Sequence, residues 1–281
     1  MVVFAGGEEA VLSGEAHCRA DISLPGAQEE YLKALRQAGL PVVCVIMAGR
    51  PLTLGNVAAN VDALLFNFHP GTMGGPAIAN IMAGKVNPSG HLPVSFPKMA
   101  GQLPLYYNHK NTGRPAEEMT LIDDIPLEAG QTSTGCTSFY LDAGDGPLFP
   151  FGYGLSYTDF SYSEPRLSRT QISPSGEIMV SCDITNTGSV AGKTVAQLYV
   201  RDLVGSLVRP VRELKDFEKV ELQPGETRTV TFRLPAHALA FHDADANEIV
   251  EPGEFNVWVA QNAADGTPVS FSIVDESTAE R

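Results

Sequence analysis

The sequence predicts an α/β region followed by an all-β region. Up to about residue 97, short apolar runs alternate with helical patterns, and the run at residues 42–47 is entirely apolar with four β-branched residues of six. Such a run is typical of a parallel strand buried on both faces. After residue 158, apolar residues recur at every second position between turn signals. This second pattern is typical of an antiparallel β-sandwich.

The α/β region is expected to form βαβ units. Its elements, in chain order, are a strand at residues 1–5, a helix at 26–38, strands at 42–47 and 62–68, and a helix at 74–83. Gly39 and Gly84 are the expected helix stops. This order predicts a parallel sheet with helices on its faces. Parallel sheets usually carry about five or six strands, so we expect part of this sheet to lie outside the chain.

Residues 98–146 carry no periodic pattern and predict a long connector. Tyr106, Tyr107, His109 and Arg114 give it a polar and aromatic character. These side chains could contact a sugar ring, or they could anchor the connector to the domain that it crosses.

Residues 147–157 form a dense run of Pro, Gly and aromatic residues. This run predicts aromatic side chains that pack into a neighbouring surface and fasten a domain junction. The expected domains are 1–97 (part of an α/β sandwich domain), 98–157 (connector and linker) and 158–281 (β-sandwich).

The alternating strands of the last region are expected around Ile178–Ile184, Ala196–Val200, Val230–Leu234 and Phe255–Val259. Turn signals lie at residues 186–188, 223–226 and 251–253. The sequence pattern contains no cysteine pair that would span the two sheets of the sandwich. The sandwich should therefore be of the fibronectin type III kind rather than the antibody kind.

The composition excludes several classes of protein. The 281 residues include 33 acidic and 19 basic side chains, which give a net charge of -14. Nucleic-acid binding requires clustered Lys and Arg, which are missing here. No apolar run approaches the roughly 18 to 20 residues of a membrane span, and no signal peptide is visible. We therefore expect no nucleic-acid or membrane partner.

Cysteine and aspartate patterns argue against a metal site. The four cysteines form no CxxC pair, so a zinc site is not expected. Cys44 and Cys182 lie in strand-like runs and should be buried free thiols. The acidic runs at residues 142–145 and 243–245 do not match an EF-hand loop and are interpreted as solvated turns. No cofactor or metal is predicted.

Glu15 is the candidate for chemistry. It lies in the loop after the first strand, and open α/β sheets present their ligands at the carboxyl ends of their strands. A carboxyl group whose pKa is raised by burial can serve as a general acid. Glu8 and Glu9 share the loop and are competing candidates, and each Glu could instead be a solvated loop residue. Ser13 could contact substrate or Glu15, or could be a backbone cap.

Four segments resemble known enzymes. The first is Ser13-Gly14-Glu15, with Arg19, Asp21 and Leu24-Pro25; the others are residues 68–75 with 87–97, residues 147–157, and residues 214–229. Together they resemble the C-terminal half of family 3 glycoside hydrolases of the β-glucosidase type. The first motif departs from the commoner family version, because Ala16 replaces a Gly and Cys18 replaces an Asp.

The resemblance implies a retaining mechanism with two carboxyl groups about 5 to 5.5 Å apart. In the family, the nucleophile is an Asp on a preceding (β/α)8 barrel, and the general acid/base is the Glu that Glu15 matches. No barrel pattern fits in this chain, so a barrel chain or domain is the implied partner. The implied substrate is a β-linked oligosaccharide or aryl glycoside. An exposed sheet edge should drive association, which leaves a homodimer open.

Other functions remain open at this level. The chain could be a non-catalytic carbohydrate-binding or structural module, because a fold does not determine a function. A nucleotide-binding domain is disfavoured, since Gly6 and Gly7 belong to no phosphate-binding glycine motif. The sugar is not determined by the sequence. The location would be periplasmic or secreted if a preceding segment carries a signal, and otherwise cytoplasmic.

Overall fold

A computed structural model describes residues 1–132 and 135–275. The chain divides into two compact units. The first comprises Met1–Val86, Val94–Leu105 and Ala116–Pro150, and the second comprises Asn87–Pro93, Tyr106–Pro115 and Phe151–Arg281. The domain boundaries expected near residues 97 and 158 remain predictions.

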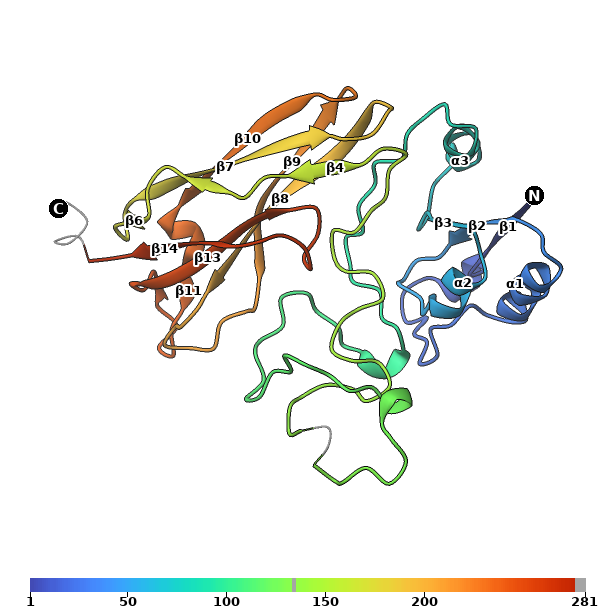
Figure 1. Cartoon of the computed structure of the whole chain (residues 1–281), viewed down its shortest axis with the longest axis horizontal. Coiled ribbons are helices and arrows are strands. Elements are labelled where there is room, and N and C mark those ends of the chain that lie inside the picture. The colour runs from blue at the N-terminus through green and yellow to red at the C-terminus, as the bar shows by residue number, and fades with distance from the viewer. Residues whose placement is uncertain (133–134, 276–281) are drawn as a thin grey trace. The chain divides into compact units, whose positions relative to one another are not determined.

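The first unit contains a parallel sheet in the order β1-β2-β3 (Figure 1). The strands are β1 (Val2–Gly7), β2 (Val42–Met47) and β3 (Ala63–Phe66). The central strand β2 contributes four buried residues, which accounts for its β-branched apolar sequence. The α/β prediction is confirmed for this region.

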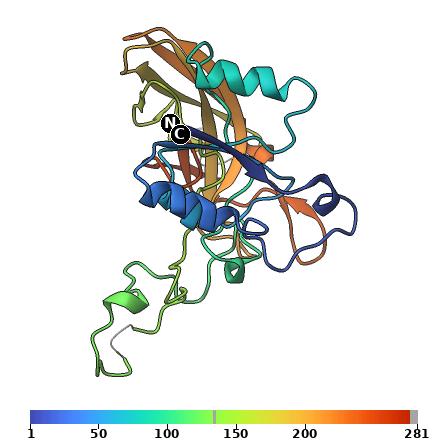
Figure 2. The ribbon, with the colours of Figure 1, turned by 90° about the vertical axis from the view of Figure 1, so that its right-hand side faces the viewer.

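Three helices accompany the sheet: α1 (Gln28–Gln37), α2 (Gly55–Ala59) and α3 (Gly74–Met82). Figures 1 and 2 show α1 and α2 on one side of the sheet and α3 on the other. Gly39 and Gly84 follow α1 and α3 with φ values of 71° and 68°. A left-handed residue of this kind is the usual end of a helix, as the sequence predicted.

Two local features differ from the sequence prediction. Strand β1 continues through Gly6 and Gly7, which pair with Ile46 and Met47, although the strand was expected to end at residue 5. Helix α2 was not predicted, because five residues are too few to establish a helical period.

The remainder of the first unit is largely irregular. Its short 3-10 helices are η1 (Ala10–Leu12), η2 (Ala100–Gln102) and η3 (Ile122–Asp124). Phe96 and Phe149 form an isolated antiparallel bridge, and their rings lie 6.3 Å apart. The Lys98 Nζ group donates to the Ala143 carbonyl at 2.7 Å. Such contacts give an aperiodic segment fixed attachment points.

The second unit contains a β-sandwich (Figure 1) whose strands pair antiparallel except for one short parallel pair. One sheet has the order β10-β7-β4 with β5 also on β7; the other has the order β6-β14-β13-β8-β9. The strands are β4 (Phe160–Tyr162), β5 (Arg166–Leu167), β6 (Gln171–Ile172), β7 (Glu177–Asn186), β8 (Gly192–Asp202), β9 (Glu213–Leu222), β10 (Thr227–Pro235), β13 (Gly253–Ala260) and β14 (Val269–Ile273). Smaller elements are η4 (Ala236–Leu239) and the β11 (Phe241–His242) and β12 (Glu248–Ile249) pair.

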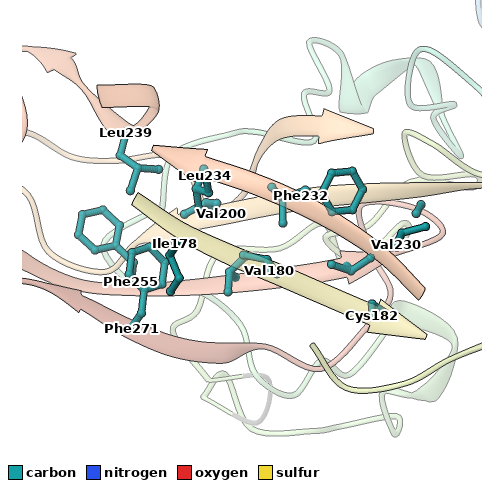
Figure 3. Packing of buried hydrophobic residues seen from close by; sticks show 14 of the residues in the cluster. Ile178, Val180, Cys182, Val200, Val230, Phe232, Leu234, Leu239, Phe255 and Phe271 are labelled. Atoms are coloured by element: carbon teal, nitrogen blue, oxygen red, sulfur yellow. The ribbon is translucent and has the colours of Figure 1, made fainter. Parts of the chain in front are cut away.

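Alternate residues of these strands point into a shared core (Figure 3). Strand β7 shows the pattern most regularly, with every second residue from Ile178 to Asn186 buried. Phe255 and Phe271 stack across β13 and β14 with ring centroids 5.3 Å apart. The period of two that predicted a sandwich therefore arises from burial of one face of each strand.

Part of the connector is attached to this second unit. The Tyr107 ring stacks on Phe151 at 4.3 Å and meets the edge of Tyr199 at 6.1 Å. The Leu214 backbone N–H donates to the Tyr107 hydroxyl at 3.2 Å. Tyr107 is thus an anchor, whereas Tyr106 is 63% exposed.

The described part of the chain has no helix long and apolar enough to cross a bilayer. Within the same residues, no three His, Cys, Asp or Glu side chains are grouped to hold a metal ion. Cys44 and Cys182 are buried free thiols, as predicted, while Cys18 and Cys136 are exposed. The Asp243 carboxylate accepts from the backbone N–H groups of Asp245 and Asn247, each at 2.9 Å, which is the geometry of a turn.

Candidate functional site

Three loops of the first unit follow the carboxyl ends of the parallel strands. Residues 8–25 follow β1, residues 48–54 follow β2, and residues 67–73 follow β3. The Glu8 N–H donates to the Met47 carbonyl at 2.9 Å, so the pairing of β1 with β2 extends into the first loop. This edge is where an open parallel sheet presents functional side chains.

Glu8 is buried between two arginines. Its side chain is 0% exposed, and its two carboxylate oxygens accept from Arg19 Nη1 at 2.8 Å and from Arg50 Nε at 3.1 Å. A buried carboxylate is stable when it is paired and hydrogen-bonded in this way. The ion pairs join the loop after β1 to the loop after β2, which makes Glu8 a structural residue of this edge.

Arg50 also holds the backbone on either side of Glu15. Its Nη2 atom donates to the carbonyl of Leu12 and, at 3.0 Å, to the carbonyl of His17. The His17 N–H closes a turn on the Gly14 carbonyl at 3.1 Å. One guanidinium therefore fixes both ends of the short segment that carries Glu15.

Glu15 is exposed near the tip of this turn. The next residue, Ala16, has a φ of 63°, a left-handed conformation that costs a residue with a Cβ more than it costs glycine. Among the described residues, no hydrogen bond or ion pair occupies the Glu15 carboxylate. The carboxylate is thus open to solvent.

The return of the loop to the core is fixed by apolar and polar contacts. Ile22 and Leu24 are each 4% exposed. Gln28 donates to the Gly7 and Pro25 carbonyls at 2.9 and 2.8 Å and accepts from the Gly7 N–H. The Ser23 N–H donates to the Asp21 carboxylate at 2.9 Å, and this contact lowers the pKa of Asp21.

Ser13 contacts the third loop. Its Oγ atom lies 3.1 Å from Nε2 of His69, a residue that follows β3. Ser13 therefore bonds to a side chain 56 positions away rather than capping its own loop. Its predicted contact with substrate stays a prediction, as does the catalytic role of Glu15.

The structure thus places Ser13, Glu15 and the buried Glu8 in one loop at the carboxyl edge of the sheet. Two further residues, which sequence reasoning missed, contact this loop. Arg50 and His69 each follow a predicted strand and stand directly before a proline. That position was the available signal, but nothing in the sequence indicated that either side chain reaches the first loop.

Solved structures share this fold. A crystal structure of a β-glucosidase from Listeria innocua in complex with isofagomine matches with a TM-score of 0.87 and 39% identity, over 96% of this chain and 36% of that chain. A β-glucosidase from Erythrobacter marinus matches with a TM-score of 0.83 and 37% identity, over 97% of this chain. The chain covers 34% of the Erythrobacter protein.

Curated relatives of this chain are likewise named as glycosidases. The chain is 41% identical over 98% of its length to a periplasmic β-glucosidase of Salmonella typhimurium, and 40% identical over 97% to a β-xylosidase of Formosa agariphila. It spans about a third of the length of each, 34% and 35%. Fold and relatives together place the chain in the class of glycoside hydrolases.

The family model of the glycosyl hydrolase family 3 C-terminal domain matches residues 1–157, and that of the fibronectin type III-like domain matches residues 194–263. This chain belongs to glycosyl hydrolase family 3.

Proposed function

We propose that this chain supplies the general acid/base of a retaining β-glycosidase that removes terminal β-D-glycosyl residues, with Glu15 in that role. The proposal rests mainly on the contrast between two glutamates of one loop. Glu8 is buried and held by Arg19 and Arg50, whereas Glu15 is exposed at the tip of a fixed turn. Of these two glutamates, only Glu15 has a carboxyl group that a glycosidic oxygen can approach, and Glu9, which is also exposed, serves as the control for it.

The mechanism needs a second carboxylate. In a retaining enzyme it attacks the anomeric carbon while the acid protonates the leaving oxygen, and the two groups lie about 5 to 5.5 Å apart. Glu15 would donate its proton to the leaving oxygen and then remove a proton from the incoming water. We propose that the nucleophile is an Asp of a (β/α)8 barrel, in another chain or domain, because no residue described here occupies the nucleophile motif of the family.

The glycone is proposed to be glucose, with xylose as the main competitor, because relatives named for both sugars match the chain over nearly its whole length. We further propose domain boundaries at residues 97 and 158. The periplasmic name of the Salmonella relative favours a periplasmic or secreted location. A homodimer is proposed as one route by which the exposed sheet edge is covered.

The direct test is hydrolysis of p-nitrophenyl β-glucoside and β-xyloside. This chain is assayed alone and then together with a candidate barrel. We expect activity only in the mixture. Activity of the chain alone would contradict the proposal, because a complete site would then lie within these residues. Normal activity of the mixture toward phenyl β-glucoside, which has a poor leaving group, after Glu15→Gln would favour a non-catalytic carbohydrate-binding or structural role.

A further inference from the structure

We propose that His69 is a positioning residue for Glu15 and that it acts through its hydrogen bond with Ser13. This inference rests on the proposed role of Glu15 as general acid/base. The Ser13 Oγ and His69 Nε2 atoms are 3.1 Å apart, and Ser13 stands two positions before Glu15. The contact ties the turn that carries Glu15 to the loop after β3.

The hydrogen bond adds a third attachment to the Glu15 turn. The first is the continuation of β1 itself, and the second is Arg50, which reaches the turn from the loop after β2. Arg50 donates to backbone carbonyls at the two ends of the segment. His69 bonds to the Ser13 side chain from the loop after β3. This contact limits rotation of the turn about the line between those two ends.

A glycine makes room for the pair. A Cβ atom placed on Gly49 would lie 2.7 Å from His69 Nε2 and closer still to Ser13 Oγ. Real Cβ atoms do not approach other atoms this closely, and Gly49 does not have a left-handed φ that would by itself favour glycine. The space required by the Ser13–His69 pair therefore explains why a glycine stands here.

The backbone before His69 is held in an unusual conformation. Phe68 has a φ of 48°, a left-handed value that is rare for a bulky residue. Its ring packs edge-on against Phe66 at 4.7 Å and against Phe96 at 6.4 Å. Strain of this kind persists only where surrounding packing enforces it, and it clusters at functional sites. Here the reversed backbone comes directly before the residue that meets Ser13.

The test measures how turnover in the assembled enzyme depends on the leaving group. General-acid catalysis matters for a poor leaving group such as phenol and little for an activated one such as dinitrophenol. We expect His69→Ala to lower kcat/KM for phenyl β-glucoside by roughly 10- to 100-fold, because small misplacement of a catalytic group has effects of that order. The kcat/KM of the dinitrophenyl glucoside, which reports the glycosylation step alone, should change by less than about 3-fold, because that step needs little protonation.

Three further variants test whether His69 acts through Ser13. His69→Gln keeps a polar nitrogen at similar reach and should recover part of the loss. Ser13→Ala combined with His69→Ala should cost no more than His69→Ala alone, because residues that act as a unit are not additive. His237→Ala, which removes an exposed histidine in η4, is the matched control and should leave both substrates unaffected.

The outcomes separate this inference from the proposed function. If Glu15→Gln slows phenyl glucoside selectively while His69→Ala slows both substrates equally or neither, the positioning role is wrong and the role of Glu15 stands. If Glu15→Gln has no selective effect, the proposed function itself fails. Thermal unfolding of each variant identifies any loss that comes from misfolding. A double variant that loses clearly more kcat/KM than His69→Ala alone would also overturn the coupling.

Discussion

Arg50 Nε donates to Glu8 Oε2 across 3.1 Å, and this ion pair joins the loop after β2 to the loop after β1. The Glu8 side chain is fully buried, so its charge depends on Arg50 and Arg19 for compensation. The same guanidinium holds the carbonyl of His17. The buried pair therefore connects the stability of the fold to the position of the turn that presents Glu15.

The first prediction concerns Glu8. Glu8→Gln leaves two partly buried arginines without a counter-charge and should lower the free energy of unfolding by about 3 kcal/mol, at the low end of the cost of breaking a buried pair. Glu9→Gln is the matched control, because Glu9 is exposed and its replacement should change stability by less than about 0.5 kcal/mol. Urea unfolding measures both, and equal effects would contradict the structural role of Glu8.

Ala16 offers a prediction in the opposite direction. Its φ of 63° suits glycine, so Ala16→Gly should raise the free energy of unfolding by up to about 1 kcal/mol, after allowance for the greater freedom of glycine in the unfolded chain. Ala10→Gly, in the 3-10 helix η1, should lower stability by about 0.5 to 1 kcal/mol. Thermal unfolding compares them; a loss of stability in both would show that the Ala16 conformation carries no strain.

The thiols predict a two-class labelling pattern. Burial raises the pKa of Cys44 to about 11 and also raises the pKa of Cys182. Because the thiolate is the reactive form, we expect Cys18 and Cys136 to react rapidly with Ellman's reagent in the native protein. Cys44 and Cys182 should react only after unfolding. Four thiols that react at one rate would contradict the burial of these two.

The contacts of Asp183 in the sandwich should make the stability of the fold depend on pH in the acid range. Arg166 donates to both carboxylate oxygens at 2.8 and 2.9 Å, and the Thr229 hydroxyl donates at 2.6 Å. These contacts lower the pKa of Asp183 to about 2, below its usual value of about 3.9. The folded state therefore binds a proton less readily than the unfolded state. The stabilisation is present above about pH 4 and is lost as the pH falls toward 2.

This dependence can be isolated with Asp183→Asn, which cannot titrate. The unfolding temperatures of the wild type and the variant are measured between about pH 6 and pH 2. The wild type should be the more stable at the upper end, and the difference should shrink as the pH falls. Two parallel curves would mean that the Arg166 pair adds no pH-dependent stability.

Sequence patterns predicted the elements that bury a regular face. The run at β2 and the alternation of β7 follow directly from burial on two faces and on one face, respectively. Strand β9 was not predicted as a strand, because only Val220 and Leu222 of its ten residues are buried and the period of two is weak. Helix α2 was missed because of its length.

The candidate site was predictable only in part. Glu15 could be placed at a strand end because the strand before it is visible in the sequence. Arg50 and His69 could not be assigned to the site, since they reach the loop from 33 and 56 positions away. Contacts of that kind depend on the alignment of three parallel strands, which hydrophobic periodicity does not encode. The burial of Glu8 was hidden for the same reason.

The role of Glu15 is tested most directly by Glu15→Gln in the assembled enzyme, with phenyl and dinitrophenyl β-glucosides compared side by side. A lost general acid should reduce turnover of the phenyl glucoside by roughly 10²- to 10⁴-fold, while the activated substrate, which needs little protonation, should lose far less in its glycosylation step. Glu9→Gln, in the same loop, should leave both rates unchanged. Equal rates for the wild type and Glu15→Gln on the phenyl glucoside would contradict the central claim.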